Sequence, residues 1–229
     1  MRKLRQAFAA GSGLSEFSAR MRHIFVVNLL WVLCSLPVVT YGAASAAAQD
    51  TLQYTDRAEK LKTAKLFFSA LRRHFRRASI LWLELACIGA VLGGGIYLIA
   101  RSGSRNAALL SIAFFFLFLY GIILAYAFYV LVRSDGSPAE ILVFSLMGGL
   151  RQLPRSVPVV LLASVPVVMF VFFTEWFLYT GLLWLVYGFA FIAYVSQLIM
   201  RSALRKLARD TDFVLPAPEE IPAEAASGI

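Results

Sequence analysis

The chain has 229 residues, of which 60% are hydrophobic and only 15% are charged, and its mean hydropathy is +0.74. Soluble domains average about 45–50% apolar and about 25% charged residues, so the composition indicates an integral membrane protein. A helical membrane domain uses most of such a length and leaves no room for a soluble catalytic domain of ordinary size. The net charge of +9 does not indicate nucleic-acid binding, because the basic residues lie beside apolar segments, where anionic lipid headgroups explain them.

The amino-terminal part pairs a basic segment with an apolar one. Residues 1–20 are basic and polar, and we expect a cytoplasmic tail or a short surface helix. An apolar run follows at residues 24–39, and Pro37 and Gly42 then interrupt it with a turn. This order also resembles a secretory signal peptide, with residues 43–48 as the cleavage region. A leader of that kind would be long, and the shaped turn favours a retained membrane segment.

The rest of the chain alternates apolar runs with short polar breaks. We expect membrane spans at residues 78–100, 107–132, 157–173 and 177–200. Pro158 and Pro166 should bend the third of these runs. The tail at residues 216–229 has Pro, Ala and Glu without periodicity, and we expect it to be disordered. The sequence therefore predicts a single transmembrane helical domain at residues 1–215.

Two stretches of the chain look related. One pair of spans is preceded by Phe67-Phe68-Ser69 and Phe75-Arg76-Arg77. Another pair is preceded by Val143-Phe144-Ser145 and Leu150-Arg151-Gln152. Each unit would be an interfacial amphipathic helix followed by a helical hairpin, which makes a parallel repeat. The predicted fold is thus an all-α polytopic membrane bundle with five to six membrane helices and two interfacial helices.

The number of crossings depends on the segment after Gly42. If residues 43–65 do not cross, there are five spans and seven basic residues lie outside. If the chain turns at Pro37 and crosses back, both termini are cytoplasmic and 20 of the 22 basic residues lie inside, all except Arg101 and Arg105. The positive-inside rule favours this six-helix arrangement. The cost of this arrangement is that the segment that crosses back, residues 43–65, places polar side chains in the membrane.

The segment at residues 66–77 is amphipathic at helical spacing. Phe68, Leu71 and Phe75 fall on one side of the helix. The other side carries Arg72, Arg73, Arg76 and Arg77. Such a helix lies in the membrane interface, so these arginines are candidate contacts for anionic lipid headgroups or for an acidic partner protein. The sequence does not separate these two partners.

Two carboxylates stand out because ionisable groups inside a membrane are costly and are often functional. Glu84 lies about two turns inside the span at residues 78–100, and Asp50 lies in the segment at residues 43–65. Both are candidate intramembrane functional carboxylates. The alternative for each is a structural role, by pairing with a neighbouring helix or by extending toward the basic flank.

Other motifs are weaker. Gly89 with Gly93, and Gly42 with Ala46, have the spacing at which helices pack closely. Cys34 and Cys87 lie in apolar runs and are expected to be small buried side chains rather than a disulfide. No zinc-protease, serine-hydrolase or phosphate-loop motif occurs, and His23 and His74 lack a second ligand at metal spacing. We therefore expect no catalytic residue, cofactor or metal.

One family resemblance is carried by two stretches. Residues 28–44 read NLLWVLCSLPVVTYGAA, and residues 67–78 read FFSALRRHFRRA and continue into Leu81-Trp82. Together they resemble the YesL-like family of small bacterial membrane proteins. The resemblance implies no catalytic residue. By association with sugar uptake, it implies an accessory role beside the permease subunits of a carbohydrate ABC importer.

Three functions follow as hypotheses. The first is a non-enzymatic accessory or scaffold component of such an importer. The second is an independent small-solute transporter or channel that uses Asp50 and Glu84. The third, an intramembrane enzyme, lacks a nucleophile with a matching base. We place the accessory role first.

Overall fold

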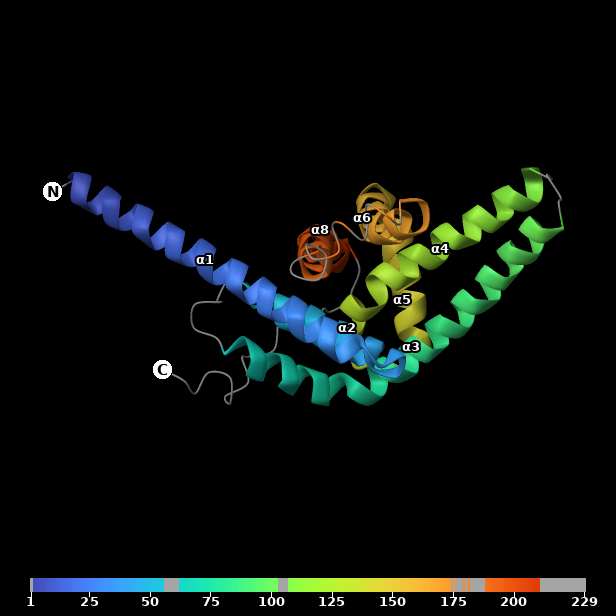
Figure 1. The fold of residues 1–229 in the computed structure, drawn as a ribbon, viewed down its shortest axis with the longest axis horizontal. Helices are drawn as coiled ribbons and strands as arrows, with labels where there is room; N and C mark the ends of the chain where they lie inside the picture. Colours follow the sequence, from blue (N-terminus) through green and yellow to red (C-terminus); the bar gives the residue numbers. More distant parts are fainter. Residues whose placement is uncertain are drawn as a thin grey trace.

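The computed structural model describes residues 2–55, 62–102, 107–173, 175, 179, 181 and 188–210. Within these residues every regular element is a helix, which confirms that the fold is all-α. The elements are α1 (Arg2–Ser35), η1 (Val38–Thr40), α2 (Tyr41–Leu52), α3 (Thr63–Arg101), α4 (Ala107–Leu131), α5 (Pro138–Arg151), α6 (Leu153–Phe172) and α8 (Phe189–Asp210). Figure 1 shows α6 and α8 nearly end-on while α1, α3 and α4 lie across the view, so the helices cross at steep angles.

Three stretches are long and apolar enough to cross a membrane. They are Glu16–Ser35 in α1, Thr63–Ile99 in α3 and Ala108–Leu131 in α4. Shorter apolar stretches occupy Leu153–Pro166 and Phe189–Met200. These lengths agree with an integral membrane protein. The predicted tail at residues 216–229 and most of the break before the last predicted span lie outside the described residues.

The amino-terminal segment turns back on itself. α1 runs from Arg2 to Ser35 without a break, so the expected separate tail is instead the first part of one long helix. After the turn at Pro37, α2 runs back along α1 (Figure 1). Thr40 closes the turn by donating its hydroxyl to the carbonyl of Cys34 at 2.6 Å. With 12 residues, α2 is about 18 Å long, which is shorter than the hydrocarbon core of about 30 Å.

α2 is almost entirely buried because small residues let α3 approach closely. A Cβ at Gly42 would lie 2.4 Å from both the carbonyl oxygen of Ala78 and the Cβ of Trp82. Ala46, one turn later, is fully buried in the apolar core that α2 shares with α3, α4 and α5. The predicted Gly42–Ala46 spacing is therefore a helix-packing face between α2 and α3.

α3 joins two segments that the sequence predicts as separate. The basic segment at residues 66–77 and the apolar run at 78–100 form one helix of 39 residues. No Gly or Pro occurs between Thr63 and Ile88, so nothing in the backbone ends the helix there. The helix bends along its length instead, and its second half runs beside α4 (Figure 1). The second unit of the predicted repeat differs, because Gln152 leaves the helical conformation and separates α5 from α6.

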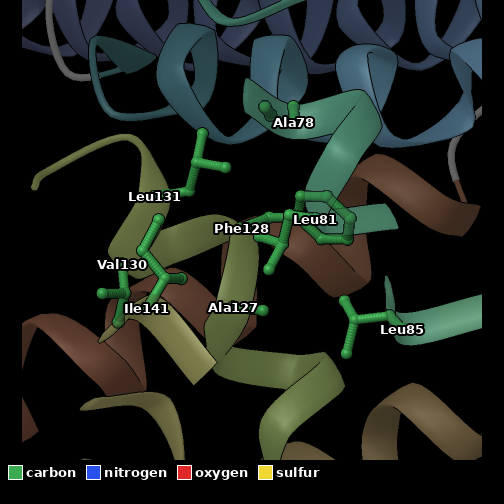
Figure 2. Packing of buried hydrophobic residues seen from close by; sticks show 9 residues of the cluster. Ala78, Leu81, Leu85, Ala127, Phe128, Val130, Leu131 and Ile141 are labelled. Atoms are coloured by element: carbon green, nitrogen blue, oxygen red, sulfur yellow. The ribbon is translucent and has the colours of Figure 1, made fainter. Parts of the chain in front are cut away.

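The largest apolar core lies where α3, α4 and α5 meet. Figure 2 shows Leu81 and Leu85 of α3 against Phe128 of α4. Leu131 of α4 and Ile141 of α5 complete the contact and are 1% exposed. This core holds the inner halves of α3 and α4 in place, while their outer halves extend beyond it.

Candidate functional site

The most distinctive site is a buried carboxylate at the end of α2. The side chain of Asp50 is 2% exposed, and Arg73 of α3 forms an ion pair with it at 2.5 Å. His74 Nε2 lies 3.3 Å from the same oxygen. Because a carboxylate only accepts hydrogen bonds, that nitrogen carries the proton in this contact. Gln53, one turn along, donates its amide to the other carboxylate oxygen.

The contacts continue from Gln53 to the end of α4. Arg133 donates to the amide oxygen of Gln53 at 3.2 Å. Its guanidinium also lies 3.7 Å from the ring centroid of Tyr129. We call Asp50, Gln53, Arg73, His74 and Arg133 the Asp50 cluster. It ties α2, α3 and the carboxyl end of α4 together.

The electrostatics of the cluster favour the charged form of Asp50. Asp50 lies outside the three candidate spans. Burial by itself raises the pKa of its carboxyl, but the hydrogen bond from His74 and the charge and hydrogen bond of Arg73 outweigh burial and hold the pKa below its ordinary value. The group therefore does not exchange protons near neutral pH, and its arrangement is that of a structural ion pair.

Further polar contacts fix α1 and α8 around the same end of α2. His23 of α1 binds the carbonyl of Thr51 at 3.1 Å and the hydroxyl of Thr63 at 2.8 Å. Gln197 of α8 donates to the side-chain oxygen of Gln49 at 2.6 Å. One end of the α1–α2 hairpin thus lies beside the beginning of α3.

α8 is also tied to the middle of α1. The side-chain oxygen of Asn28 accepts from the backbone N–H of Ala190 at 2.8 Å. Asn28 is fully buried, so this hydrogen bond fixes the beginning of α8 against α1 inside the protein.

The four predicted arginines divide into two pairs. Arg73 belongs to the Asp50 cluster. Arg77 donates to the carbonyls of Ser134 and Gly136, at 2.7 and 2.8 Å, and so holds the loop between α4 and α5. Arg72 and Arg76 are exposed, and no hydrogen bond or ion pair joins them to the described residues.

The helix that carries these arginines is buried on a different side from the one that the sequence predicts. Phe67 and Ala70, not Phe68 and Phe75, are the residues that are buried. Phe68 is 48% exposed and Phe75 is 45% exposed. The expected apolar side is therefore open, because α2 packs on the side that carries Phe67, Ala70 and His74.

Glu84 differs from Asp50. It is half-buried on α3, and its Oε2 atom is buried without a hydrogen-bond partner among the described residues. Asp50 is held by Arg73, His74 and Gln53, and Glu84 is not among these partners. The two predicted carboxylates therefore do not form one site. Cys34 and Cys87 are free, and Cys87 is exposed, so its predicted burial is wrong.

Sequence reasoning missed the partners of Asp50. Arg73 and Asp50 are 23 residues apart, and Gln53 and Arg133 are 80 apart, so helical periodicity gives no sign of either contact. The available signal was the pairing rule itself, since a carboxylate inside a membrane protein needs a basic partner. Among the described residues, no three His, Cys, Asp or Glu side chains are grouped to hold a metal ion.

The comparisons with known proteins give one family. The family model described as "Protein of unknown function, DUF624" matches residues 24–95. This range covers the apolar part of α1, α2 and most of α3, and the residues that carry the YesL-like resemblance lie inside it. No curated protein and no solved structure matches the chain.

Proposed function

We propose that this protein is a non-enzymatic, multi-pass membrane protein that serves as an accessory or scaffold subunit for another membrane protein. The observation that carries the proposal is the outer half of the α3–α4 hairpin, which extends away from the other helices (Figure 1). Its apolar side chains are open: Val91 is 76% exposed, Leu98 67% and Phe114 67%. Side chains of this kind need lipid or the helices of a partner around them.

Glycines on the outer half of α3 indicate that helices of a partner, and not lipid alone, surround these side chains. A Cβ at Gly93, Gly94 or Gly95 would meet no atom within 4 Å. Gly89, by contrast, packs within the hairpin, where a Cβ would lie 2.7 Å from the hydroxyl of Tyr120. Small residues let membrane helices approach closely, so the run at 93–95 offers a contact face that no described part of this chain occupies.

The topology that we propose has six crossings, with both termini cytoplasmic in a bacterial cell membrane. The reversal at Pro37 supports it, because the contact of His23 with Thr63 places the basic end of α1 beside the start of α3. Nearly all Lys and Arg residues then share one side, as the positive-inside rule requires. The partner class, permease subunits of a carbohydrate ABC importer, comes from the YesL-like resemblance.

Co-purification tests this role. The tagged full-length chain is extracted from its native membrane in mild detergent, and its companions are identified by mass spectrometry. Gly94→Leu should reduce recovery of the permease subunits without changing the fold, since the position is open. Leu109→Ile, on the facing helix, keeps the apolar character and is the matched control. Recovery of the protein alone, under conditions that preserve the permease complex, contradicts the proposal.

A transporter is the second candidate, and Glu84 is the observation that favours it. A buried carboxylate oxygen without a partner is costly and is a common feature of ion and proton paths. Solute flux in liposomes that contain only this protein would support the alternative. If Glu84→Gln left such a flux unchanged, this carboxylate would have no part in it.

A further inference from the structure

The exposed side of the first half of α3 combines aromatic and basic residues. Phe68, Arg72, Phe75 and Arg76 lie at positions that share one side of a helix, and all four are exposed. We call them the Phe–Arg face. The opposite side is fixed against α2, because Phe67 is 0% and Ala70 1% exposed. The helix therefore cannot turn to bury the two phenylalanines within this chain.

The two arginines of this face are available, whereas their neighbours are not. Arg73 is engaged by Asp50, and Arg77 by the loop carbonyls. Arg72 and Arg76 have no such contact with the described residues. They stand one turn apart, so both guanidinium groups can reach one anionic group or two adjacent ones.

The position along α3 decides between a water-facing and a membrane-facing partner. The helix continues without a break from Arg76 into the apolar half, where Leu83 is 65% exposed on the same side. An acidic protein groove would pair the arginines but would leave the neighbouring rings against a charged surface. A phospholipid supplies both a phosphate for the guanidiniums and acyl chains for the rings.

We propose that the Phe–Arg face is a binding site for the headgroup of an anionic phospholipid. The phosphate sits between Arg72 and Arg76, and the rings of Phe68 and Phe75 enter the boundary between headgroups and acyl chains. This site requires membrane insertion but not the partner subunit proposed above, so either proposal can fail without the other.

The test uses the full-length protein in detergent, titrated with phosphatidylglycerol or with phosphatidylcholine and examined by native mass spectrometry. We expect phosphatidylglycerol to remain bound at concentrations where phosphatidylcholine does not. Arg72→Gln with Arg76→Gln should weaken retention by roughly tenfold. Arg22→Gln with Arg101→Gln removes the same charge from exposed arginines elsewhere and should change retention by less than about twofold.

Two further arms identify the source of the anion. Phe68→Ser with Phe75→Ser keeps the charge and should still weaken lipid retention, and excess inorganic phosphate should not displace the lipid. If the Arg72/Arg76 and Arg22/Arg101 double variants lost lipid retention equally, the site would be overturned, because the positive charge would then act without regard to its position. Retention of polyglutamate in preference to phosphatidylglycerol would overturn the lipid assignment in favour of an acidic protein. Circular dichroism verifies that the exposed substitutions leave the helices intact.

Discussion

Removing Arg73 should destabilise the protein more than removing the charge of Asp50, although the two form one ion pair. Arg73→Gln leaves a carboxylate that is 2% exposed with only His74 and Gln53 beside it. Loss of one partner from a buried pair costs about 3–5 kcal/mol. Because the Arg73 side chain is 35% exposed, solvent already screens the pair, and we expect the lower end, about 3 kcal/mol.

Asp50→Asn should cost less, about 1–2 kcal/mol, because Arg73 can then extend into solvent while the amide keeps a hydrogen bond. The double variant buries no charge, so it should be about 1–2 kcal/mol more stable than Arg73→Gln alone. Arg72→Gln, one residue away and exposed, is the control and should stay within about 0.5 kcal/mol of the unmodified protein.

The assay is reversible unfolding in mixed detergent micelles, followed by circular dichroism and tryptophan fluorescence. The free energies of unfolding of the two single variants and the double variant complete a thermodynamic cycle. If adding Asp50→Asn to Arg73→Gln lowered stability further, the carboxylate would not depend on Arg73 for compensation. That result would refute the reasoning about the Asp50 cluster.

Three other outcomes are expected. Gly42→Ala should cost about 1–3 kcal/mol of unfolding free energy because its Cβ collides with the α3 backbone, whereas Gly93→Ala should be nearly neutral; equal effects would contradict the packing of α2. The lowered pKa of Asp50 predicts that its contribution to stability is complete above the unfolded pKa of about 3.9 and is lost as the pH falls through the lower folded value, so Asp50→Asn should remove this part of the acid sensitivity below about pH 4. On a cysteine-free background, single cysteines at Ser12 and Ser102 should react with an impermeant reagent from opposite sides of the membrane, and labelling of both from outside would contradict the proposed topology.

The membrane helices could be predicted from hydropathy, but the positions at which one helix ends and the next begins could not. The apolar run at 107–132 corresponds to α4 within a residue, because a long uninterrupted run is a strong signal. The continuity of α3 was not predicted, since four arginines among apolar residues look like an interfacial helix. The helical backbone does not respond to that change of composition, and no Pro lies in this part of the helix to end it.

The candidate site was predicted only in part. Asp50 stands out in sequence because it is a charge in a segment that the six-helix arrangement places in the membrane. Its pairing with Arg73 depends on the register between α2 and α3, which the close approach at Gly42 sets. Likewise, nothing in the local pattern distinguishes Arg73 and Arg77 from Arg72 and Arg76. Only the packing of α2 and of the loop after α4 assigns them different partners.

The dependence of Asp50 on α3 constrains how the chain is made. When the ribosome has produced only α1 and α2, the carboxylate has neither of its basic partners, and a short helix in this state is a poor substrate for release into lipid. Residues 73 and 74 leave the exit tunnel later, so we expect the hairpin to remain in a hydrated place, at the insertion machinery or the membrane surface, until α3 arrives. We therefore expect the first half of the protein to insert cooperatively rather than helix by helix.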